Sequence, residues 1–347
     1  MTTAQTGSKA REPLPVTILA GFLGAGKTTL LKRILSDPQG TRFGVLVNDF
    51  GEINIDAELV VEMGADQISL ANGCVCCSIR DDLVDAARRL VESEPRPQHI
   101  VIETSGVSRP LSVVDALLED DLRELLKLDS IYCLVDAAGL LDLDFASTEL
   151  AIDQAACADI VLLNKCDLVS EDQLRAIEET LQGPVPNVPI LRTRFADVPR
   201  AILFATPPAR GEALERAHIT RHAHEHHHDG RGDDESHAHD HVSEFESWSW
   251  GSADPLDSKK FRQAVRQLPP GLLRAKGILR FADRPEGRGV FHLVGKRTSL
   301  EQEPGPVPAL SQLVAIGRRG SVDRDALTRL FQGCRSIAPV SDGSGAA

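Results

Sequence analysis

The sequence predicts an α/β protein: a domain with a mostly parallel sheet, followed by a small α+β domain. Three observations lead to this fold class. From residue 14 to about 204, short apolar runs alternate with helical patterns, as in strand–helix–strand units. Between about 211 and 242 the composition changes to His, Asp, Gly and Arg, with few large apolar residues. A second region with strand and helix patterns follows.

The first domain is predicted to contain at least five strands, each a short apolar run. These runs are residues 16–20, 44–47, 99–102, 131–135 and 160–163. Helical patterns lie between them at 28–35, 81–90 and 115–128. Four of the strands are followed by a polar residue, namely Asn48, Glu103, Asp136 and Asn164. Because the carboxyl ends of parallel strands meet at one edge, where open sheets bind ligands, we expect one site there.

The second domain is predicted from alternation and helical spacing. Strands are expected at 245–250, 274–281, 290–294 and 313–317, and helices at 258–268 and 323–330. Trp248 and Trp250 are expected to pack its core. The predicted boundaries are therefore a first domain over 14–210, a flexible His-rich linker over 211–243 and a second domain over 244–336, with disordered ends at 1–13 and 337–347.

Composition narrows the class of protein. The chain has 347 residues, 42% of them hydrophobic, which is enough for two cores. It carries 38 basic and 51 acidic residues, a net charge of −13 with no basic stripe, so no nucleic acid partner is expected. No apolar run approaches the ~18 residues of a membrane span, and residues 1–13 lack the apolar core of a signal peptide. We therefore expect a cytoplasmic protein with no membrane partner.

The most informative motif is Gly-Phe-Leu-Gly-Ala-Gly-Lys-Thr at residues 21–28, which fits G-x-x-x-x-G-K-[ST]. It lies between a predicted strand and a predicted helix, as this motif requires. Its glycines let backbone N–H groups point at phosphate oxygens beside the N-terminus of the helix. Lys27 adds a positive charge, and the Thr28 hydroxyl can ligate Mg²⁺. The motif predicts a bound nucleoside triphosphate.

Asn164-Lys165-Cys166-Asp167 fits N-K-x-D and favours guanine. The Asp carboxylate can accept both hydrogen bonds that guanine N1–H and the 2-amino group donate, and adenine has no such pair. A polar turn at the end of a strand is the alternative interpretation.

Glu103-Thr104-Ser105-Gly106 follows another predicted strand. There a carboxylate would hold Mg²⁺ or its water, and Gly106 would let the chain approach the γ-phosphate. A capping role for Glu103 stays open. Asp136 likewise fits either the nucleotide edge or a turn cap.

Asn72-Gly73-Cys74-Val75-Cys76-Cys77 places three thiols at a tight turn. Such thiols can converge on Zn²⁺ or another soft or borderline cation. Three buried apolar cysteines are the alternative. Three thiolates are fewer than the four ligands of a closed structural zinc site, and an incomplete shell suits a transferable metal.

In this order the motifs resemble the CobW-type metallochaperone GTPases, relatives of the urease and hydrogenase nickel-insertion GTPases. The resemblance rests on G-F-L-G-A-G-K-T, N-D-F-G-E at 48–52, N-G-C-V-C-C, E-T-S-G and N-K-C-D, and it covers about residues 14–335. It implies a P-loop GTPase domain fused to a CobW C-terminal domain. Metal binding at C-x-C-C would be linked to GTP binding and hydrolysis.

The resemblance also implies site residues. Phosphates and Mg²⁺ would be held by Gly24, Ala25, Gly26, Lys27, Thr28 and Thr29, guanine by Asn164, Lys165 and Asp167, and the transferred metal by Cys74, Cys76, Cys77 and Asp49. Lys27 and Glu103 are the predicted catalytic residues. Many relatives have Glu where this chain has Asp49, so whether Asp49 or Glu52 completes the metal shell stays open.

The implied function is a GTP-hydrolysing metallochaperone that delivers a divalent ion, zinc first, to an apo-metalloprotein client. The expected cofactors are GTP, Mg²⁺ and Zn²⁺. Three alternatives stay open: a Co²⁺ chaperone for cobalamin synthesis or nitrile hydratase maturation, a metal storage or sensor protein with a GTP-dependent state, and a kinase, against which N-K-x-D speaks. A homodimer also stays open.

Two further segments are predicted to take part in metal binding, one by capturing ions and one as a switch. Nine of the eleven histidines lie between His218 and His241, where neutral imidazoles could capture ions weakly for the cysteine site. A plain solvated linker is the alternative. Residues 48–56 carry Asp49, Glu52 and Asp56 and are the predicted switch segment, which GTP with Mg²⁺ would order.

Overall fold

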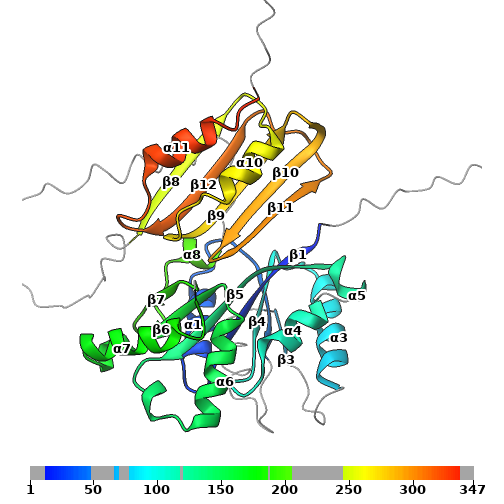
Figure 1. The fold of residues 1–347 in the computed structure, drawn as a ribbon. Helices are drawn as coiled ribbons and strands as arrows, with labels where there is room; N and C mark the ends of the chain where they lie inside the picture. Colours follow the sequence, from blue (N-terminus) through cyan, green and yellow to red (C-terminus); the bar gives the residue numbers. More distant parts are fainter. Residues whose placement is uncertain are drawn as a thin grey trace, which may run out of the picture. The chain divides into compact units, whose positions relative to one another are not determined.

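The computed structural model describes residues 12–47, 66–69, 78–117, 120–186, 188–204 and 245–336. The chain divides into two compact units, Met1–Val198 and Pro199–Ala347 (Figure 1). The first unit contains a seven-stranded sheet and the second a five-stranded sheet. The domain boundaries predicted at 210 and 244 fall within residues 205–244, which lie outside the described residues.

All strand pairs of the first sheet are parallel, and the strand order is β3-β2-β4-β1-β5-β6-β7. The strands are β1 (Leu14–Gly21), β2 (Phe43–Val47), β3 (Asp66–Ser69), β4 (His99–Glu103), β5 (Leu126–Asp136), β6 (Ile160–Asn164) and β7 (Ile190–Arg192). The central strands β4, β1 and β6 and the second half of β5 are mostly apolar and buried, as expected for a parallel sheet covered on both faces. The predicted α/β fold class is confirmed.

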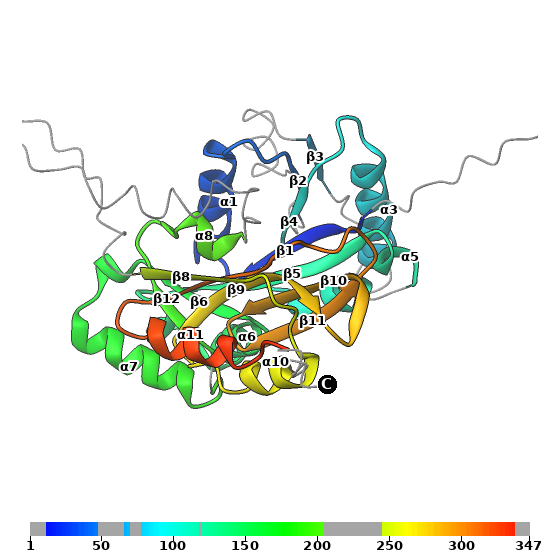
Figure 2. The same cartoon turned by 90° about the horizontal axis from the view of Figure 1, so that it is seen from above.

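Helices cover both faces of this sheet. They are α1 (Lys27–Ser36), α3 (Ser78–Glu92), α4 (Pro110–Leu117), α5 (Asp120–Arg123), α6 (Phe145–Ala156) and α7 (Glu171–Gln182), with short 3₁₀ turns η1 (Leu140–Asp142) and η2 (Cys166–Leu168). Figures 1 and 2 show α1 and α6 on opposite faces. Val16 and Ile18 of β1 belong to the same apolar core as Leu90 of α3 and Ala151 of α6. Because residues i and i+2 of a strand share a face, Val16 and Ile18 point to the face that α3 and α6 cover.

The helix predicted over residues 115–128 is confirmed at 115–117 and 120–123 and is wrong from residue 126 onward. The region contains the end of α4, the single turn α5 and the first residues of β5. Leu126 and Leu128 lie beside Leu14 and Val16 of β1 in parallel register. Pairing with a central strand therefore decides the conformation of leucines whose spacing also fits a helical face. The short strands β3 and β7 were not predicted.

The second unit is an antiparallel sheet of order β11-β10-β9-β12-β8 with two longer helices on one face (Figures 1 and 2). Its elements are α8 (Arg200–Leu203), β8 (Phe245–Ser252), α10 (Ser258–Val265), β9 (Leu272–Phe281), β10 (Arg284–Val294), β11 (Arg297–Glu303), β12 (Ser311–Arg318) and α11 (Arg324–Gln332). Trp248 and Trp250 are buried against Phe331, with ring centroids 5.5 and 5.9 Å away. The predicted α+β class and the packing role of both tryptophans are confirmed. β11 was not predicted.

A buried arginine joins the first turn of this unit to its sheet. Arg274 of β9 is 2% exposed, and its guanidinium donates to the carbonyls of Ile202 and Leu203 on α8. These carbonyls lie at the end of a four-residue helix, where such groups accept from donors outside the helix. The contact therefore docks α8 on the five-stranded sheet.

None of the helices in the described part of the chain is long and apolar enough to cross a membrane.

Candidate functional site

The phosphate-loop motif lies between β1 and α1, as its spacing predicts. Gly26 precedes the helix with φ 107°, a conformation that favours glycine, and a Cβ there would lie 2.4 Å from Asn164 Nδ2. Ala25 is buried, whereas Gly24 and Thr29 are exposed. A side chain at position 26 would therefore separate the loop from Asn164.

Lys27 folds back onto the loop that precedes it. Its side chain is 8% exposed, and Nζ donates to the carbonyl oxygens of Gly21 at 2.9 Å and Phe22 at 3.2 Å. The ammonium charge is thus held at the start of α1, where the helix already offers its positive end. This arrangement suits an anion that bears several negative charges.

Thr28 and Glu103 come together from neighbouring elements. Thr28 Oγ1 donates to Glu103 Oε1 at 2.7 Å. Glu103 ends β4, lies beside Leu19 of β1 in parallel register, and is 5% exposed. A hydroxyl and a carboxylate are oxygen ligands of the kind Mg²⁺ prefers. The structure therefore brings together the two residues that the sequence assigns to Mg²⁺.

Asn164 ends β6 and contacts two loops at once. Its Nδ2 donates to Ala25 O at 2.9 Å, and its Oδ1 accepts from Ala196 N–H at 2.8 Å. The side chain is 2% exposed, so both hydrogen bonds are shielded from water. Asn164 thus ties the phosphate loop to the loop that follows β7.

Lys165 and Asp136 form an ion pair at the ends of adjacent strands. Lys165 has φ 61°, and its Nζ lies 2.7 Å from Asp136 Oδ2. The other Asp136 oxygen accepts from the backbone N–H groups of Ala138 and Gly139. Asp136 therefore caps a turn, one of the two roles considered from sequence, and also holds the Lys165 ammonium. Asp167 on η2 is exposed, and no described residue hydrogen-bonds its carboxylate.

The sequence analysis missed the loop that follows β7. Phe195 and Ala196 have φ 51° and 53°, a left-handed conformation that is uncommon for residues with a Cβ. Arg33 of α1 donates to Phe195 O at 2.8 Å and lies 3.4 Å from Asp197, while Thr193 Oγ1 donates to Asp197 O. β7 has only three residues, which is too short to predict from periodicity, so the sequence carried little signal for this loop.

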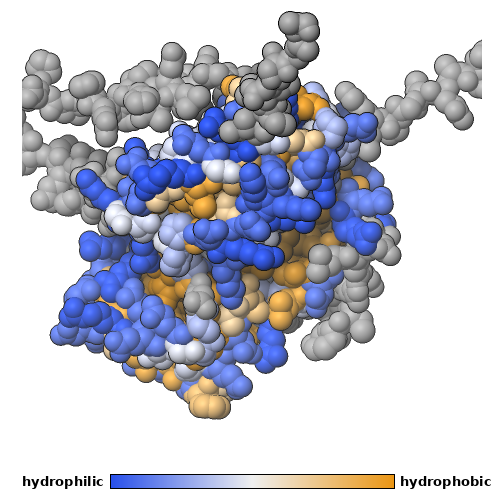
Figure 3. All heavy atoms as spheres, turned by 45° about the horizontal axis from the view of Figure 1, so that its top comes forward, coloured by the Kyte–Doolittle hydropathy of each residue, from blue (hydrophilic) through white to orange (hydrophobic). Residues whose placement is uncertain are grey.

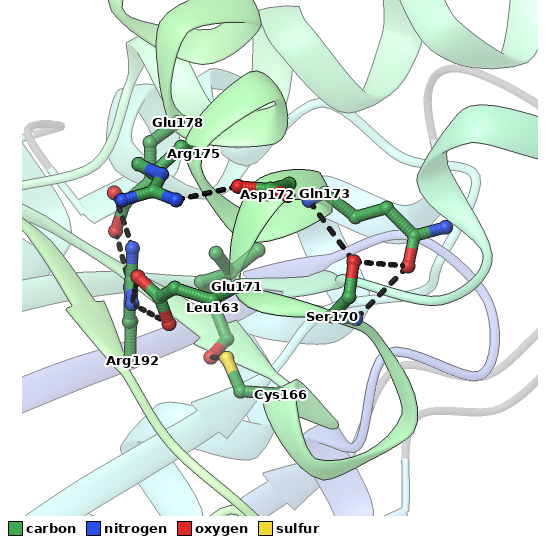
Figure 4. A network of polar contacts seen from close by, with 9 residues as sticks. All are labelled: Leu163, Cys166, Ser170, Glu171, Asp172, Gln173, Arg175, Glu178 and Arg192. Carbon is green, nitrogen blue, oxygen red and sulfur yellow. Dashed lines mark hydrogen bonds and ion pairs between the residues drawn. The ribbon is translucent and has the colours of Figure 1, made fainter.

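A polar network fixes α7 beside the guanine motif (Figure 4). Arg192 of β7 pairs with Glu178 at 2.8 Å and with Glu171 at 2.7 Å. Hydrogen bonds to Glu178, and then to Glu171, raise the pKa of the Arg192 guanidinium. Ser170 and Gln173 form a capping box at the start of the same helix. The network ties β7 to α7, the helix that follows residues 164–167.

Cys166 occupies the variable position of N-K-x-D and points inward. Its Sγ donates to Leu163 O at 3.0 Å (Figure 4). Its backbone N–H donates to Thr193 O. Burial raises the pKa of the Cys166 thiol. The residue packs the turn rather than facing the site, which leaves Lys165 and Asp167 at the surface side.

Most large apolar side chains that the described residues expose follow the carboxyl ends of the parallel strands. They are Leu23, Val107, Leu111, Leu141, Phe145, Leu168 and Phe195. The face drawn in Figure 3 is mostly hydrophilic, with hydrophobic residues in separate areas. The edge that carries Lys27, Glu103 and Asn164 therefore combines polar groups with exposed apolar side chains, as ligand-binding surfaces do.

The predicted residues of the transferred-metal site are Cys74, Cys76, Cys77, Asp49 and Glu52, and they lie outside the described residues, as does the His-rich segment. In the ranges that the structure describes, no three His, Cys, Asp or Glu residues form a group that could hold a metal ion. The four cysteines found there, Cys133, Cys157, Cys166 and Cys334, are not in disulfide bonds.

Two protein-family models match the chain. The first, described as CobW/HypB/UreG, nucleotide-binding domain, matches residues 15–192. The second, described as cobalamin synthesis protein cobW C-terminal domain, matches residues 245–335. Together they cover the parallel-sheet unit and the antiparallel-sheet unit up to the end of α11.

Several relatives are similar over long stretches. A zinc chaperone CobW from Sinorhizobium sp is 32% identical over 232 residues, which cover 59% of this chain and 65% of the relative. Zinc-regulated GTPase metalloprotein activator 1 from Dictyostelium discoideum is 29% identical over 340 residues, covering 83% of this chain and 67% of the relative. The chain thus matches about two thirds of the length of these two curated relatives. The crystal structure of Zn(II)-bound YjiA GTPase from E. coli is 23% identical, with a TM-score of 0.45, covering 94% of this chain and 100% of that one.

Proposed function

This chain belongs to the CobW/HypB/UreG family of P-loop GTPases, and from that premise we propose that it hydrolyses GTP to deliver zinc to a client metalloprotein. The observation that carries the nucleotide part is Asn164, which joins the phosphate loop and the loop after β7 in one hydrogen-bonded unit. The zinc part is supported by the C-x-C-C sequence and by relatives named as a zinc chaperone and a zinc-regulated GTPase metalloprotein activator.

The phosphates of GTP would be held by the backbone of Gly24, Ala25 and Gly26 and by the charge of Lys27. The Thr28 hydroxyl and the Glu103 carboxylate, 2.7 Å apart, fit Mg²⁺ as oxygen ligands. When bound, Mg²⁺ neutralises charge on the β- and γ-phosphates. Lys27 is already oriented toward the loop by Gly21 and Phe22, and it stabilises the charge that develops as the γ-phosphate leaves.

The guanine base would lie between Lys165 and the loop that contains Ala196. Asp167 would accept hydrogen bonds from N1–H and the 2-amino group, and its exposure leaves it open to a ligand. Asp136 fixes the Lys165 ammonium, so the aliphatic stem can lie along the base. Asn164 sets the distance between the base and the phosphates, because it contacts both loops.

The cargo metal would be bound by Cys74, Cys76 and Cys77, with Asp49 or Glu52 completing the shell. Zinc is favoured over cobalt because thiolates are good zinc ligands and because the names of both relatives mention zinc. Residues 48–56 connect this turn to the phosphate site along the chain. GTP would order them, and hydrolysis would release them, so that metal affinity differs between nucleotide states.

Zinc transfer to a fluorescent zinc chelator tests the proposal. Zinc-loaded protein is mixed with the chelator alone, with GTP and Mg²⁺, or with a non-hydrolysable GTP analogue. Faster transfer that requires hydrolysable GTP is expected, and it should be lost in Lys27→Ala and in the triple Cys74→Ser, Cys76→Ser, Cys77→Ser variant.

Transfer at the same rate in every nucleotide state would indicate metal storage instead of delivery. Selective loading with Co²⁺ would identify cobalt as the cargo.

A further inference from the structure

Gln154 on α6 holds the loop that follows β4. Its side chain is fully buried, and Nε2 donates to Gly106 O at 3.1 Å and to Ser108 O at 2.8 Å. These partners fix the orientation of the amide, because the opposite orientation would set its oxygen against two carbonyl oxygens. One amide group thus determines where two consecutive parts of the loop lie.

The loop held by Gln154 lies directly against the phosphate loop. A Cβ on Gly106 would be 2.7 Å from Leu23 N and 2.8 Å from the Leu23 side chain. Only glycine lets the two backbones approach this closely. On its other side the loop is fixed to β1, because Thr104 N–H donates to Leu19 O at 2.9 Å. The position of Gly106 is therefore set by β1 on one side and by Gln154 on the other.

Gln154 is a poor choice for packing alone. In the described part of the structure its Oε1 has no hydrogen-bond partner, although the atom is buried. A buried amide oxygen without a donor destabilises a fold, and a methionine of similar size would avoid that cost. Neighbouring Asp153 contacts the same region through an ion pair with Arg109 at 3.0 Å, but both side chains are well exposed. The buried amide is thus the stronger of the two links between α6 and the loop.

We propose that Gln154 is a positioning residue that holds Gly106 at the phosphate loop and thereby sets the preference of this protein for GTP over GDP. The inference rests on the proposed function and on the prediction from sequence that Gly106 lets the chain approach the γ-phosphate of GTP. GDP lacks that phosphate and makes no such contact with Gly106. A contact that the protein makes with GTP and not with GDP raises its affinity for GTP alone.

Nucleotide affinities of a Gln154→Met variant test this role. Methionine keeps the volume but removes both hydrogen bonds to the loop. We expect the Kd for a non-hydrolysable GTP analogue to rise about tenfold, the effect of losing roughly one net hydrogen bond. The Kd for GDP should stay within about twofold, and Asp153→Ala, the matched control on the same helix, should change both constants by less than about twofold.

The outcomes separate this inference from the proposed function. Equal changes for the GTP analogue and GDP, or no change for either, would overturn the role of Gln154 while leaving GTP binding by the wild type intact. A wild-type protein that binds neither nucleotide would contradict the proposed function itself. If Gln154→Met does not fold, Gln154→Asn keeps a buried amide with a shorter reach, and the same comparison of the two affinities decides the question.

Discussion

Asn164 donates a hydrogen bond to the Ala25 carbonyl at 2.9 Å, across 139 positions of sequence. This contact joins the end of β6 to the turn before α1. The same side chain accepts a hydrogen bond from the loop after β7, so one buried amide spaces the groups assigned to phosphate and to guanine. Asn164 therefore connects the two motifs in space.

Replacing Asn164 with Ala should weaken GTP and GDP binding alike. The substitution removes both hydrogen bonds and leaves the Ala25 carbonyl and the Ala196 N–H buried without that partner. We expect a loss of roughly 2 kcal/mol in binding free energy, or about thirtyfold in Kd. Fluorescent guanine nucleotides measure both constants. A variant that loses GTP affinity but keeps GDP affinity would contradict the view that Asn164 spaces base and phosphates.

Replacing Asp167 with Asn should change which base is bound. Asn presents an N–H where Asp presents a second acceptor, so it pairs poorly with the guanine 2-amino group and well with the 2-carbonyl of xanthine. GTP affinity should fall by about a hundredfold, the order expected for losing charge-assisted hydrogen bonds, with a gain for XTP. Because Asp167 is exposed and pairs with no described residue, the thermal midpoint should not move. Unchanged selectivity would remove Asp167 from the base site.

Much of the fold could be predicted because its signals are local. The central strands contain mostly apolar runs, and the phosphate motif fixes a strand before it and a helix after it. The polar ends of β4, β5 and β6 could be placed at one edge because parallel strands end on the same side. Strands β3 and β7 are four and three residues long, too short for a periodicity to be recognised.

The remaining site residues depend on contacts between distant segments. Gln154 lies on α6 with no motif around it, and its role follows from two carbonyls that are 46 and 48 positions away. Arg33 reaches the loop after β7 across 162 positions. Residue spacing in the sequence cannot predict such contacts, because they form only when the order of strands in the sheet brings the segments together. The motifs could be read from the chain, but the residues that hold the motifs in place could not.

Zinc should protect three thiols from alkylation and leave the buried ones unaffected. Burial raises the pKa of the Cys133 thiol to about 12 and that of Cys334 to about 11, so both stay protonated at pH 8 and react slowly. Peptide mass spectrometry after iodoacetamide treatment should therefore find Cys74, Cys76 and Cys77 labelled without metal and protected with zinc. If zinc does not change the labelling of these three cysteines, they are not zinc ligands.

Replacing Arg192 with Met should loosen α7 without abolishing nucleotide binding. The guanidinium pairs with both Glu178 and Glu171, yet it is a third exposed, so solvent screens part of the interaction (Figure 4). We expect the free energy of unfolding to fall by about 1 kcal/mol, and by less at high salt. Arg175→Met is the matched control, because its partner Asp172 is almost fully exposed and the pair should contribute little. Equal losses in both variants would contradict this difference.

The affinity of the wild-type protein for GTP, measured with and without saturating Zn²⁺, tests the central claim most directly. If the nucleotide controls metal release, the two Kd values must differ, and the Kd for Zn²⁺ with and without GTP must differ by the same factor, because coupling between two binding sites is reciprocal. A factor of about five or more is expected, corresponding to the usual range of such coupling. Identical GTP affinities in the presence and absence of zinc would show that the two sites are independent and would contradict the account.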